Sequence, residues 1–340
     1  MRAAVFKQAG QPMSIETVPD PAPQARQLIV KVGYCGICGT DLHSTREGPA
    51  MLPCNSILGH EFAGEVVAVG SELRGHWHGG ERVCALPFLG CGRCAACLTG
   101  RPFECANVQL TGIQVPGGFA EYVATGDRET VLVPESLDLQ HAALVEPLAV
   151  GLHAARIAGL QAGARVLITG AGPIGLAVLL WARALGARNV VMSEFSPERR
   201  ALAMRLGADA IIDPSQPLGP QFAEVTGGEP DLVFECVGAP GLLAQCLDAA
   251  PRRSRVVIVG VCETPDTFAP FPALLKELEI RFAVAYTRDD FETTIAMMAS
   301  GRIDAGALVT HVVSLGELPA AFEALRNPTH QCKVLARIGA

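Results

Sequence analysis

Apolar and polar positions alternate along the middle of the chain in a pattern typical of parallel strands and helices. The run ARVLITG at residues 164–170 is almost continuously apolar, as expected for a strand covered on both faces of a parallel sheet. A helix-like segment, LAVLLWARALGA, follows at residues 176–187. The pattern predicts further strands at 189–194, 208–213, 230–238 and 254–261 and further helices at 198–208 and 242–250. This alternation indicates a doubly wound α/β sheet, in which each unit adds one parallel strand.

The two ends of the chain show a different pattern, with short strands and many loops. Residues 1–33 carry β-like runs separated by the proline-rich VPDPAP, and EVVAV at residues 65–69 is a further strand candidate. Beyond residue 286 the pattern predicts a helix at 289–300, a strand at 307–313, a helix at 318–326 and a strand at 332–338. We expect these segments to pack on the N-terminal region. The predicted domains are 1–150 with 290–340, and 151–289.

Composition narrows the class of protein. The chain has 340 residues, enough for about two domains, of which 49% are hydrophobic and 18% charged. No apolar run approaches the roughly 18 residues of a membrane helix, and the start RAAVFKQAG lacks a signal region, so we expect a cytoplasmic protein without a membrane partner. The net charge of −7 argues against nucleic acid. In the cytoplasm the 12 cysteines suit metal ligation and buried thiols better than disulfides.

Four cysteines lie within one short stretch, CGRCAACLTGRPFEC at residues 91–105. Their spacing, C-x2-C-x2-C-x7-C, lets four thiolates close a tetrahedral shell around Zn2+ with no position left for substrate. The bacterial iron–sulfur run starts with the same spacing, but its fourth cysteine comes sooner and precedes a proline, whereas Cys105 precedes Ala106. The stretch therefore predicts a structural zinc loop. Its ligands are Cys91, Cys94, Cys97 and Cys105.

A second set of candidate ligands lies nearer the N-terminus. Cys38 belongs to YCGICGTDLHS, and His60 and Glu61 belong to LGHEFAGEVVAVG. A thiolate, an imidazole and a carboxylate form the mixture that a catalytic zinc uses when it keeps one position open for water or an alcohol oxygen. Their separation in sequence alone does not bring them together.

A glycine-rich turn, GAGPIG, joins the first predicted strand of the central region to its helix. In this context a G-x-G-x-x-G turn brings a pyrophosphate close to the helix N-terminus, whose unpaired N–H groups favour an anion. The next strand ends in Glu194, which is placed to accept hydrogen bonds from an adenosine ribose and to repel a 2′-phosphate. Arg199 and Arg200 are the counter-indication, since arginine can turn towards that phosphate. We expect NAD rather than NADP, with contacts from Gly170, Gly172, Pro173, Ile174, Gly175, Glu194 and Arg199.

Five motifs, in order along the chain, resemble the zinc-containing medium-chain dehydrogenase/reductase family. They are CGICGTDLH, GHEFAGEVVAVG, the cysteine loop, GGFAEY at residues 117–122 and EPLAVGLHA at residues 146–154. Glutamate in the last motif is similar to polyol, 2,3-butanediol and sorbitol dehydrogenases, whereas liver-type alcohol dehydrogenases carry a cysteine ligand there. The resemblance implies a GroES-like β-rich catalytic domain and a Rossmann domain, with NAD and the catalytic zinc in the cleft between them.

The resemblance also implies roles for single residues. Cys38 and His60 would be permanent ligands of the catalytic zinc, with Glu61 and Glu146 sharing the remaining positions. Thr40 and His43 match the hydroxyl and imidazole that relay the proton outward through the cofactor ribose, work that suits an imidazole because its pKa is near neutral. The catalytic residues expected from these roles are Thr40, His43 and Glu61.

Further cofactor contacts are expected at the carboxyl ends of two later strands. Val237 follows one strand, and Val259 and Val261 end the next, at the edge where open parallel sheets bind ligands. By resemblance, Lys333 reaches the cofactor pyrophosphate, and Arg199 matches an arginine that NAD enzymes of the family commonly carry. The resemblance also implies a homodimer or homotetramer joined at the VVIVGV edge of the sheet.

The predicted activity is reversible oxidation of a secondary alcohol or polyol to a ketone, with hydride going to NAD and zinc polarising the substrate oxygen. L-Threonine 3-dehydrogenases share CGICGTDLH, but no residue that grips the amino acid's carboxylate is evident. Zinc-independent reductases of the superfamily lack the metal ligands, which are all present here. A non-catalytic NAD-binding redox sensor would lack a ligand or relay residue, and none is missing.

Overall fold

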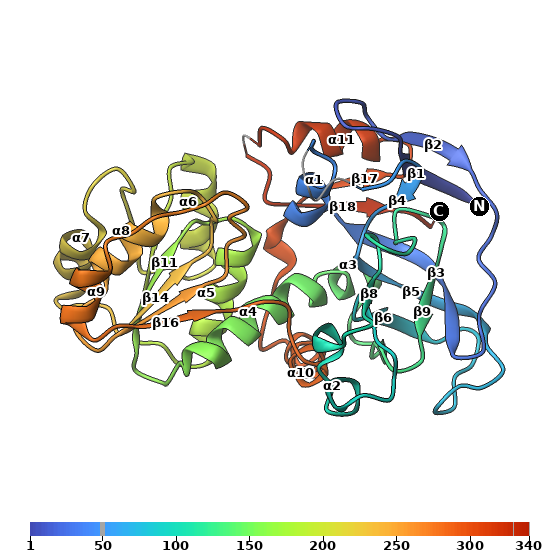
Figure 1. Cartoon of the computed structure of the whole chain (residues 1–340), viewed down its shortest axis with the longest axis horizontal. Helices are drawn as coiled ribbons and strands as arrows, with labels where there is room; N and C mark the ends of the chain where they lie inside the picture. Colours follow the sequence, from blue (N-terminus) through green and yellow to red (C-terminus); the bar gives the residue numbers. More distant parts are fainter. Residues whose placement is uncertain (48–51, 329, 340) are drawn as a thin grey trace. The chain divides into compact units, whose positions relative to one another are not determined.

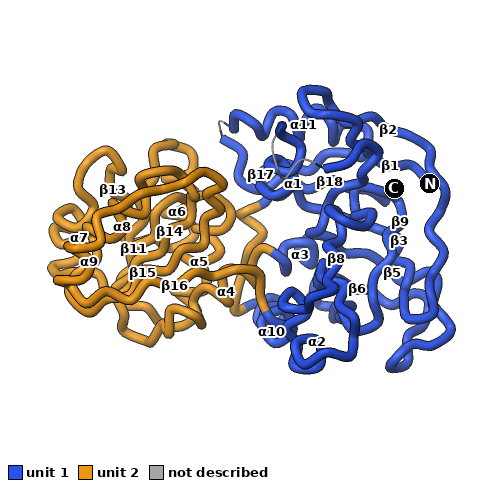
Figure 2. The backbone as a smooth tube through the Cα atoms, in the orientation of Figure 1, with its two compact units in different colours: residues 1–146, 287–301, 309–340 blue, residues 147–286, 302–308 orange. Residues whose placement is uncertain are grey.

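The computed structural model consists of two compact units (Figure 2). It describes residues 1–47, 52–328 and 330–339. Unit 1 contains residues 1–146, 287–301 and 309–340, and unit 2 contains residues 147–286 and 302–308. The boundaries lie within a few residues of the expected ones. The exception is the segment 302–308, which we expected beside the N-terminal region and which belongs to unit 2.

Unit 2 is built on a six-stranded parallel sheet that is flanked by helices (Figure 1). Its strands are β11 (Arg165–Thr169), β12 (Asn189–Ser193), β13 (Ala210–Ile212), β14 (Leu232–Glu235), β15 (Arg255–Ile258) and β16 (Glu279–Phe282). They lie in the order β13-β12-β11-β14-β15-β16, and every neighbouring pair is parallel. The central strands β11, β12 and β14 are almost wholly buried, which explains their unbroken apolar runs.

Helices flank this sheet, and most of them bury apolar side chains. They are α5 (Pro173–Ala184), α6 (Pro197–Arg205), α7 (Leu218–Thr226), α8 (Leu242–Ala249), α9 (Pro270–Lys276) and most of α4 (Val145–Ala158), with a 3-10 turn at Gly306–Leu308. Phe222 of α7 and Cys246 of α8 belong to one core cluster with Leu167, Val191 and Val233 of the sheet. The predicted doubly wound α/β architecture is confirmed.

One detail of the predicted sheet is wrong. We expected VVIVGV, which contains β15, to form the edge where two sheets join. The structure places β15 between β14 and β16, so that β16 is the edge strand. The reason is that the chain leaves β15, forms α9 and returns to add one more parallel strand.

Unit 1 contains a seven-stranded sheet that joins both ends of the chain. The main path is β10-β6-β5-β3-β18-β17, and β9 also pairs with β3. These strands are β3 (Gln27–Gly36), β5 (Glu61–Val69), β6 (Arg82–Ala85), β9 (Tyr122–Gly126), β10 (Thr130–Leu132), β17 (Val309–Ser314) and β18 (Lys333–Arg337). Because β18 pairs antiparallel with β3, the C-terminal segments pack on the N-terminal region as expected. Their apolar residues share one core cluster that includes Phe6, Phe62, Phe119 and Phe322.

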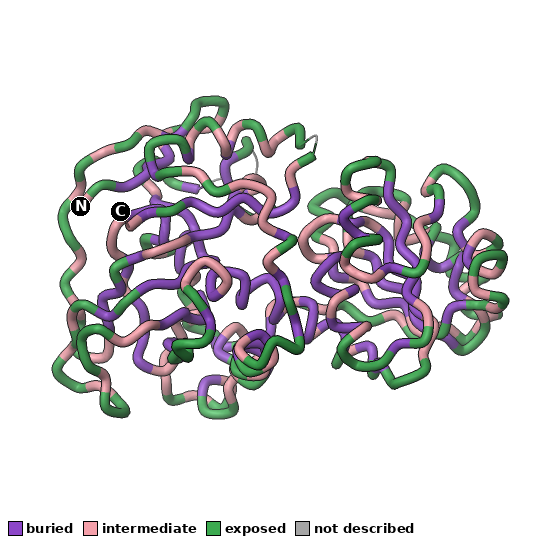
Figure 3. Tube along the Cα trace, turned by 180° about the vertical axis from the view of Figure 1, so that it is seen from behind, coloured by how far each residue is buried: buried purple, intermediate pink, exposed green. Residues whose placement is uncertain are grey.

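Shorter elements complete unit 1. The strands β1 (Arg2–Phe6), β2 (Ser14–Thr17) and β4 (Ser56–Ile57) form a small sheet, and β7 (Phe88–Leu89) pairs with β8 (Gln109–Leu110). The helices are α1 (Gly39–Ser44), α2 (Ala95–Leu98), α3 (Leu139–Ala142), α10 (Arg288–Ala299) and α11 (Leu318–Ala324), with a 3-10 turn at Pro102–Glu104. Within each unit the buried residues lie in the interior and the exposed ones gather in the outer loops (Figure 3). No helix in the described part of the chain has the length and apolar character needed to cross a membrane.

Candidate metal and cofactor sites

The pairing of β3 with β5 brings Cys38 to His60 and Glu61. Gly36 at the end of β3 lies opposite Glu61 at the start of β5, and Cys38 follows as the N-cap of α1. The ligand atoms of Cys38, His60 and Glu61 all lie within 4.8 Å of one another. Gly36 is required here because a Cβ at that position would lie 2.0 Å from Glu61 Oε2. A small buried cluster of thiol, imidazole and carboxylate suits zinc, which accepts all three.

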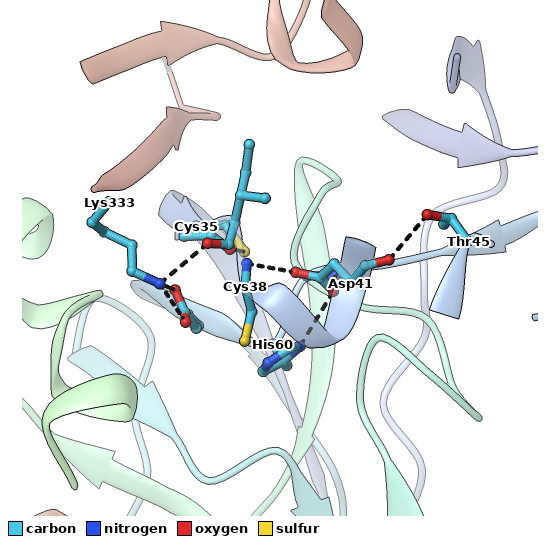
Figure 4. Close-up of polar contacts among 10 residues, drawn as sticks. Cys35, Cys38, Asp41, Thr45, His60 and Lys333 are labelled. Carbon is cyan, nitrogen blue, oxygen red and sulfur yellow. Dashed lines mark hydrogen bonds and ion pairs between the residues drawn. The ribbon is translucent and has the colours of Figure 1, made fainter. Parts of the chain in front are cut away.

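Asp41 contacts His60 and the backbone of Cys38 (Figure 4). Its Oδ1 is 3.3 Å from His60 Nδ1 and accepts the N–H of Gly59 at 3.3 Å, while its Oδ2 accepts the N–H of Cys38 at 3.0 Å. Burial opposes a charge on His60, but Asp41 and the Cys38 thiolate outweigh it and hold the pKa of His60 well above its usual value. The sequence analysis missed Asp41, although it stands three residues after Cys38 in the motif.

Lys333 forms a buried ion pair with Glu61. Its Nζ donates to Glu61 Oε1 at 2.6 Å, to Oε2 at 2.7 Å and to the carbonyl of Ile37 at 3.1 Å. Burial opposes the charge, but Glu61 and the Cys38 thiolate raise the pKa of Lys333 above its usual value. These contacts correct the expectation that Lys333 reaches a cofactor pyrophosphate, because all three of its N–H donors are already used.

Glu146 lies near this cluster without belonging to it. It is buried near the start of α4, and its charge contributes to the raised pKa of Lys333. It is not in the group of ligand atoms formed by Cys38, His60 and Glu61 among the described residues. Its role as a zinc ligand stays a prediction.

The two relay candidates lie on α1. Thr40 and His43 are three residues apart, so they share one side of this short helix; Thr40 is exposed and His43 half-buried. The helix starts at Cys38, so the relay candidates and a metal-ligand candidate share one element. The proton relay itself stays a prediction.

The cysteine loop folds into a four-thiol cluster. The sulfur atoms of Cys91, Cys94, Cys97 and Cys105 lie within 4.8 Å of one another, as a tetrahedral zinc shell requires. Backbone N–H groups of Arg93 and Cys94 lower the pKa of Cys91 to about 6, which favours the thiolate that binds metal. The loop thus offers four sulfur ligands and no open position.

Residues outside the loop hold it in place. The N–H of Arg288 donates to Gly100 O at 2.8 Å, and its guanidinium donates to the carbonyl of Arg128. Gly90 N–H donates to Glu129 Oε1 at 3.3 Å. These anchors come from α10 and from the turn before β10, and no local sequence signal marks them.

The glycine turn of unit 2 lies at the carboxyl end of β11. Gly172 is the N-cap of α5 and Pro173 begins the helix, while a Cβ on Gly175 would lie 2.0 Å from Gly170 O. Glu194 holds the turn: its Oε2 accepts the N–H of Ala171 at 2.9 Å, and its Oε1 accepts the N–H groups of Phe195 and Ser196 at 2.8 and 2.9 Å. The carboxylate expected to meet a ribose thus also shapes the turn.

The other expected cofactor contacts lie along the same edge of the sheet. Val237 is 51% exposed and Val261 61% exposed, whereas Val259 is buried. Arg199 follows the N-cap Ser196 in the first turn of α6. Val237 and Val261 can therefore present side chains to a ligand, and Val259 only its backbone.

Two family models match the chain. Residues 24–135 match "Alcohol dehydrogenase GroES-like domain", and residues 173–300 match "Zinc-binding dehydrogenase". The first match contains Cys38, His60, Glu61 and the cysteine loop, and the second contains the second half of the glycine turn and Glu194.

Characterised relatives match almost the whole chain. It is 34% identical to sorbitol dehydrogenase of Bacillus subtilis, with 98% of this chain and 95% of the relative covered. It is 32% identical to L-threonine 3-dehydrogenase of Sinorhizobium medicae, with 96% of each covered. The crystal structure of 2R,3R-butanediol dehydrogenase from Bacillus subtilis superposes with a TM-score of 0.90 at 33% identity, covering 99% of each chain.

Proposed function

The chain belongs to the zinc-type medium-chain alcohol and polyol dehydrogenase family, and from this premise we propose that it transfers hydride between a secondary alcohol or polyol and NAD. The observation that carries the proposal is the cluster of Cys38, His60 and Glu61, three kinds of zinc ligand brought together from two strands of unit 1. A zinc ion held there polarises the substrate hydroxyl and lowers its pKa.

The residues around this cluster divide the work. Asp41 orients His60 and the backbone of Cys38, so that the ligands stay in place through the reaction. Lys333 occupies both oxygens of Glu61, which leaves Glu61 available to the metal only when that pair loosens. We therefore assign Cys38 and His60 as constant ligands, with Glu61 and Glu146 sharing the remaining positions.

Proton transfer is assigned to α1. The substrate hydroxyl must lose a proton as hydride leaves carbon, and that proton needs a path to solvent. Thr40 Oγ1 passes it on through the cofactor ribose, and the imidazole of His43, which can both take up and give up a proton, releases it. Both side chains are at least partly exposed, so a proton path along α1 can reach solvent.

We assign to Glu194 the discrimination between NAD and NADP. Its carboxylate lies at the end of β12, beside the glycine turn whose Ala171 N–H it accepts. A 2′-phosphate placed there would meet a negative charge, whereas the two hydroxyls of NAD can donate to it. We infer NAD rather than NADP.

A second candidate is oxidation of L-threonine, favoured by the similarity to the Sinorhizobium medicae enzyme. Threonine carries the secondary hydroxyl that the proposed chemistry needs, together with a carboxylate and an ammonium group. Turnover of threonine at a rate matching the diols and polyols would select this candidate.

We also propose a homo-oligomer joined through the edge of unit 2. Phe282 of β16 is 70% exposed, and Phe271 and Leu274 of α9 are 67% and 68% exposed. An edge strand with unpaired backbone groups and exposed apolar side chains beside it can bind a second copy of the chain. Light scattering of the wild type and of Phe282→Lys tests this, with a shift to monomer as the expected result.

The decisive experiment combines turnover with metal analysis. We expect reduction of NAD with members of a panel of diols, polyols and other secondary alcohols, and two zinc per chain. Cys38→Ser should lose turnover and one zinc, whereas Cys262→Ser, which changes an exposed cysteine outside both clusters, should keep both. Full turnover with one zinc per chain would contradict the proposal.

We also propose a cytoplasmic location, which is in keeping with the 12 free cysteines. Cell fractionation tests this location.

A further inference from the structure

A buried carboxylate, Glu235, lies at the carboxyl end of β14. Its side chain is 3% exposed, and Oε1 accepts the N–H groups of Val237 at 2.7 Å and Gly238 at 2.8 Å. Its backbone carbonyl accepts the N–H groups of Val259 at 2.8 Å and Gly260 at 3.0 Å. One residue thus joins the segments that follow β14 and β15.

These two segments are in close backbone contact. A Cβ on Gly238 would lie 2.3 Å from the carbonyl oxygen of Val261, and a Cβ on Gly260 would lie 2.2 Å from Gly238 N and 2.7 Å from Glu235 Oε2. Gly238 also has a φ of +73°, a conformation that favours glycine. The carboxylate of Glu235 therefore lies against the backbone of both segments.

No cation neutralises this carboxylate within the part of the chain that the structure describes. The hydrogen-bond partners of its side chain are the two backbone N–H groups, and the ion pairs of the described residues do not include it. Burying a charge without an opposite charge is unfavourable. A positively charged ligand would supply the missing opposite charge.

The position of Glu235 in the sheet indicates which ligand that is. The strand order β12-β11-β14-β15 changes direction between β11 and β14, and a dinucleotide lies across such a change at the carboxyl ends of the strands. The glycine turn and Glu194 belong to the half formed by β11 and β12. Glu235 belongs to the other half, beside the exposed Val237 and Val261, where the second nucleotide binds.

We propose that Glu235 raises the affinity of the enzyme for NAD+ relative to NADH, because its negative charge stabilises the positively charged nicotinamide of NAD+ and gives no such stabilisation to the neutral ring of NADH. It is a positioning residue that also holds the Val237–Gly238 turn. This inference rests on the proposed use of NAD, and it concerns a residue outside the metal clusters.

The expected size of the effect follows from Coulomb's law. At an effective dielectric constant of about 20, two unit charges about 12 Å apart interact strongly enough to change an affinity about tenfold. Removing the charge should therefore weaken binding of NAD+ about tenfold and leave NADH nearly unchanged. Because hydride transfer converts one into the other, the same change moves the equilibrium on the enzyme away from alcohol and NAD+ by a similar factor.

Three substitutions at this site separate charge from shape. Glu235→Gln keeps an acceptor oxygen and the size of the side chain but removes the charge. Glu235→Met keeps the size and removes both charge and acceptor, whereas Glu235→Asp keeps the charge on a shorter side chain. Asp231→Asn is the matched control, since Asp231 also accepts a backbone N–H, that of Arg165 at 2.8 Å, but lies at the opposite end of β14.

Isothermal titration of the zinc-loaded enzyme with NAD+, NADH and ADP-ribose gives the readout. We expect Glu235→Gln to weaken the binding of NAD+ alone, about tenfold. Glu235→Met should weaken the binding of both NAD+ and NADH. ADP-ribose lacks the nicotinamide, so its affinity should stay within about twofold of the wild-type value in every variant. Asp231→Asn should match wild type for all three ligands. Circular dichroism confirms that each variant is folded, and if Glu235→Gln is not, the contrast between Glu235→Asp and Glu235→Met decides the question.

The inference is overturned if Glu235→Gln changes the affinities for NAD+ and NADH by the same factor, or changes neither. Equal weakening would leave Glu235 with a purely structural role in the turn. Failure of the proposed function looks different, because wild-type enzyme would then bind no dinucleotide at all.

Discussion

Replacing Lys333 with methionine tests how much the buried ion pair between Lys333 and Glu61 contributes to the free energy of unfolding. The two Nζ–Oε distances are 2.6 and 2.7 Å, and the side chains of Lys333 and Glu61 are 2% and 1% exposed. Removing one partner of a buried pair costs about 3–5 kcal/mol because the other charge remains without a partner. We expect Lys333→Met to lower the free energy of unfolding by about 3 kcal/mol, and a second change, Glu61→Gln, to restore most of it.

Denaturant unfolding of the zinc-free protein measures these differences without interference from metal loss. The wild type, the two single variants and the double variant form a cycle whose coupling energy belongs to the pair. Lys7→Met is the control, because the side chains of Lys7 and Glu16 are 36% and 35% exposed at a distance of 2.7 Å, and such pairs contribute about 0–1 kcal/mol. The reasoning is refuted if Lys333→Met costs no more than Lys7→Met, or if the double variant is less stable than Lys333→Met.

Four further predictions concern the sites already described. Asp41→Asn should lower the raised pKa of His60 and weaken zinc binding about 10- to 100-fold, which chelator competition measures, with an unchanged affinity contradicting the role of Asp41. Cys97→Ser should lose one zinc and lower the midpoint of thermal unfolding while the other zinc stays bound, as metal analysis and calorimetry will show. Burial raises the pKa of Glu129 from 4.5 to about 7, so the folded state binds the proton more tightly and stability should fall as pH rises between these values, by up to about 3 kcal/mol. Glu129→Gln should flatten that fall in unfolding measured against pH, and an unchanged slope would contradict it. Glu194→Ser should raise KM for NAD and lower KM for NADP in steady-state assays, and an unaltered ratio would remove Glu194 from the choice of cofactor.

Much of unit 2 could be predicted because its signals are local. The strand, the glycine turn and the helix from Arg165 to Ala184 are consecutive, and each follows from the residues within it. The edge strand β16 was harder to predict. Three of its residues, Glu279, Arg281 and Phe282, are exposed, so it lacks the unbroken apolar run of a strand covered on both faces. Which strand ends a sheet depends on how the whole chain returns, and no local pattern carries that information.

The metal site shows the same division. The motifs and the types of ligand identify Cys38, His60 and Glu61 from the sequence alone, and the pairing of β3 with β5 brings them together. The role of Lys333 was misassigned because its partner Glu61 is 272 residues away in sequence, and a lysine near a chain end gives no sign of being buried. Long-range electrostatic partners become visible only when the topology places their strands side by side.

The central position of β18 has a consequence for how the enzyme is made. The strand that carries Lys333 lies between β3 and β17, and it is synthesised after all of residues 147–286. Because domains fold as their chain emerges from the ribosome, unit 2 can fold before Lys333 is available to pair with Glu61. Until β18 is added, Glu61 lacks the ammonium group that binds both of its oxygens, so this part of the metal site is completed only when the last strand is made.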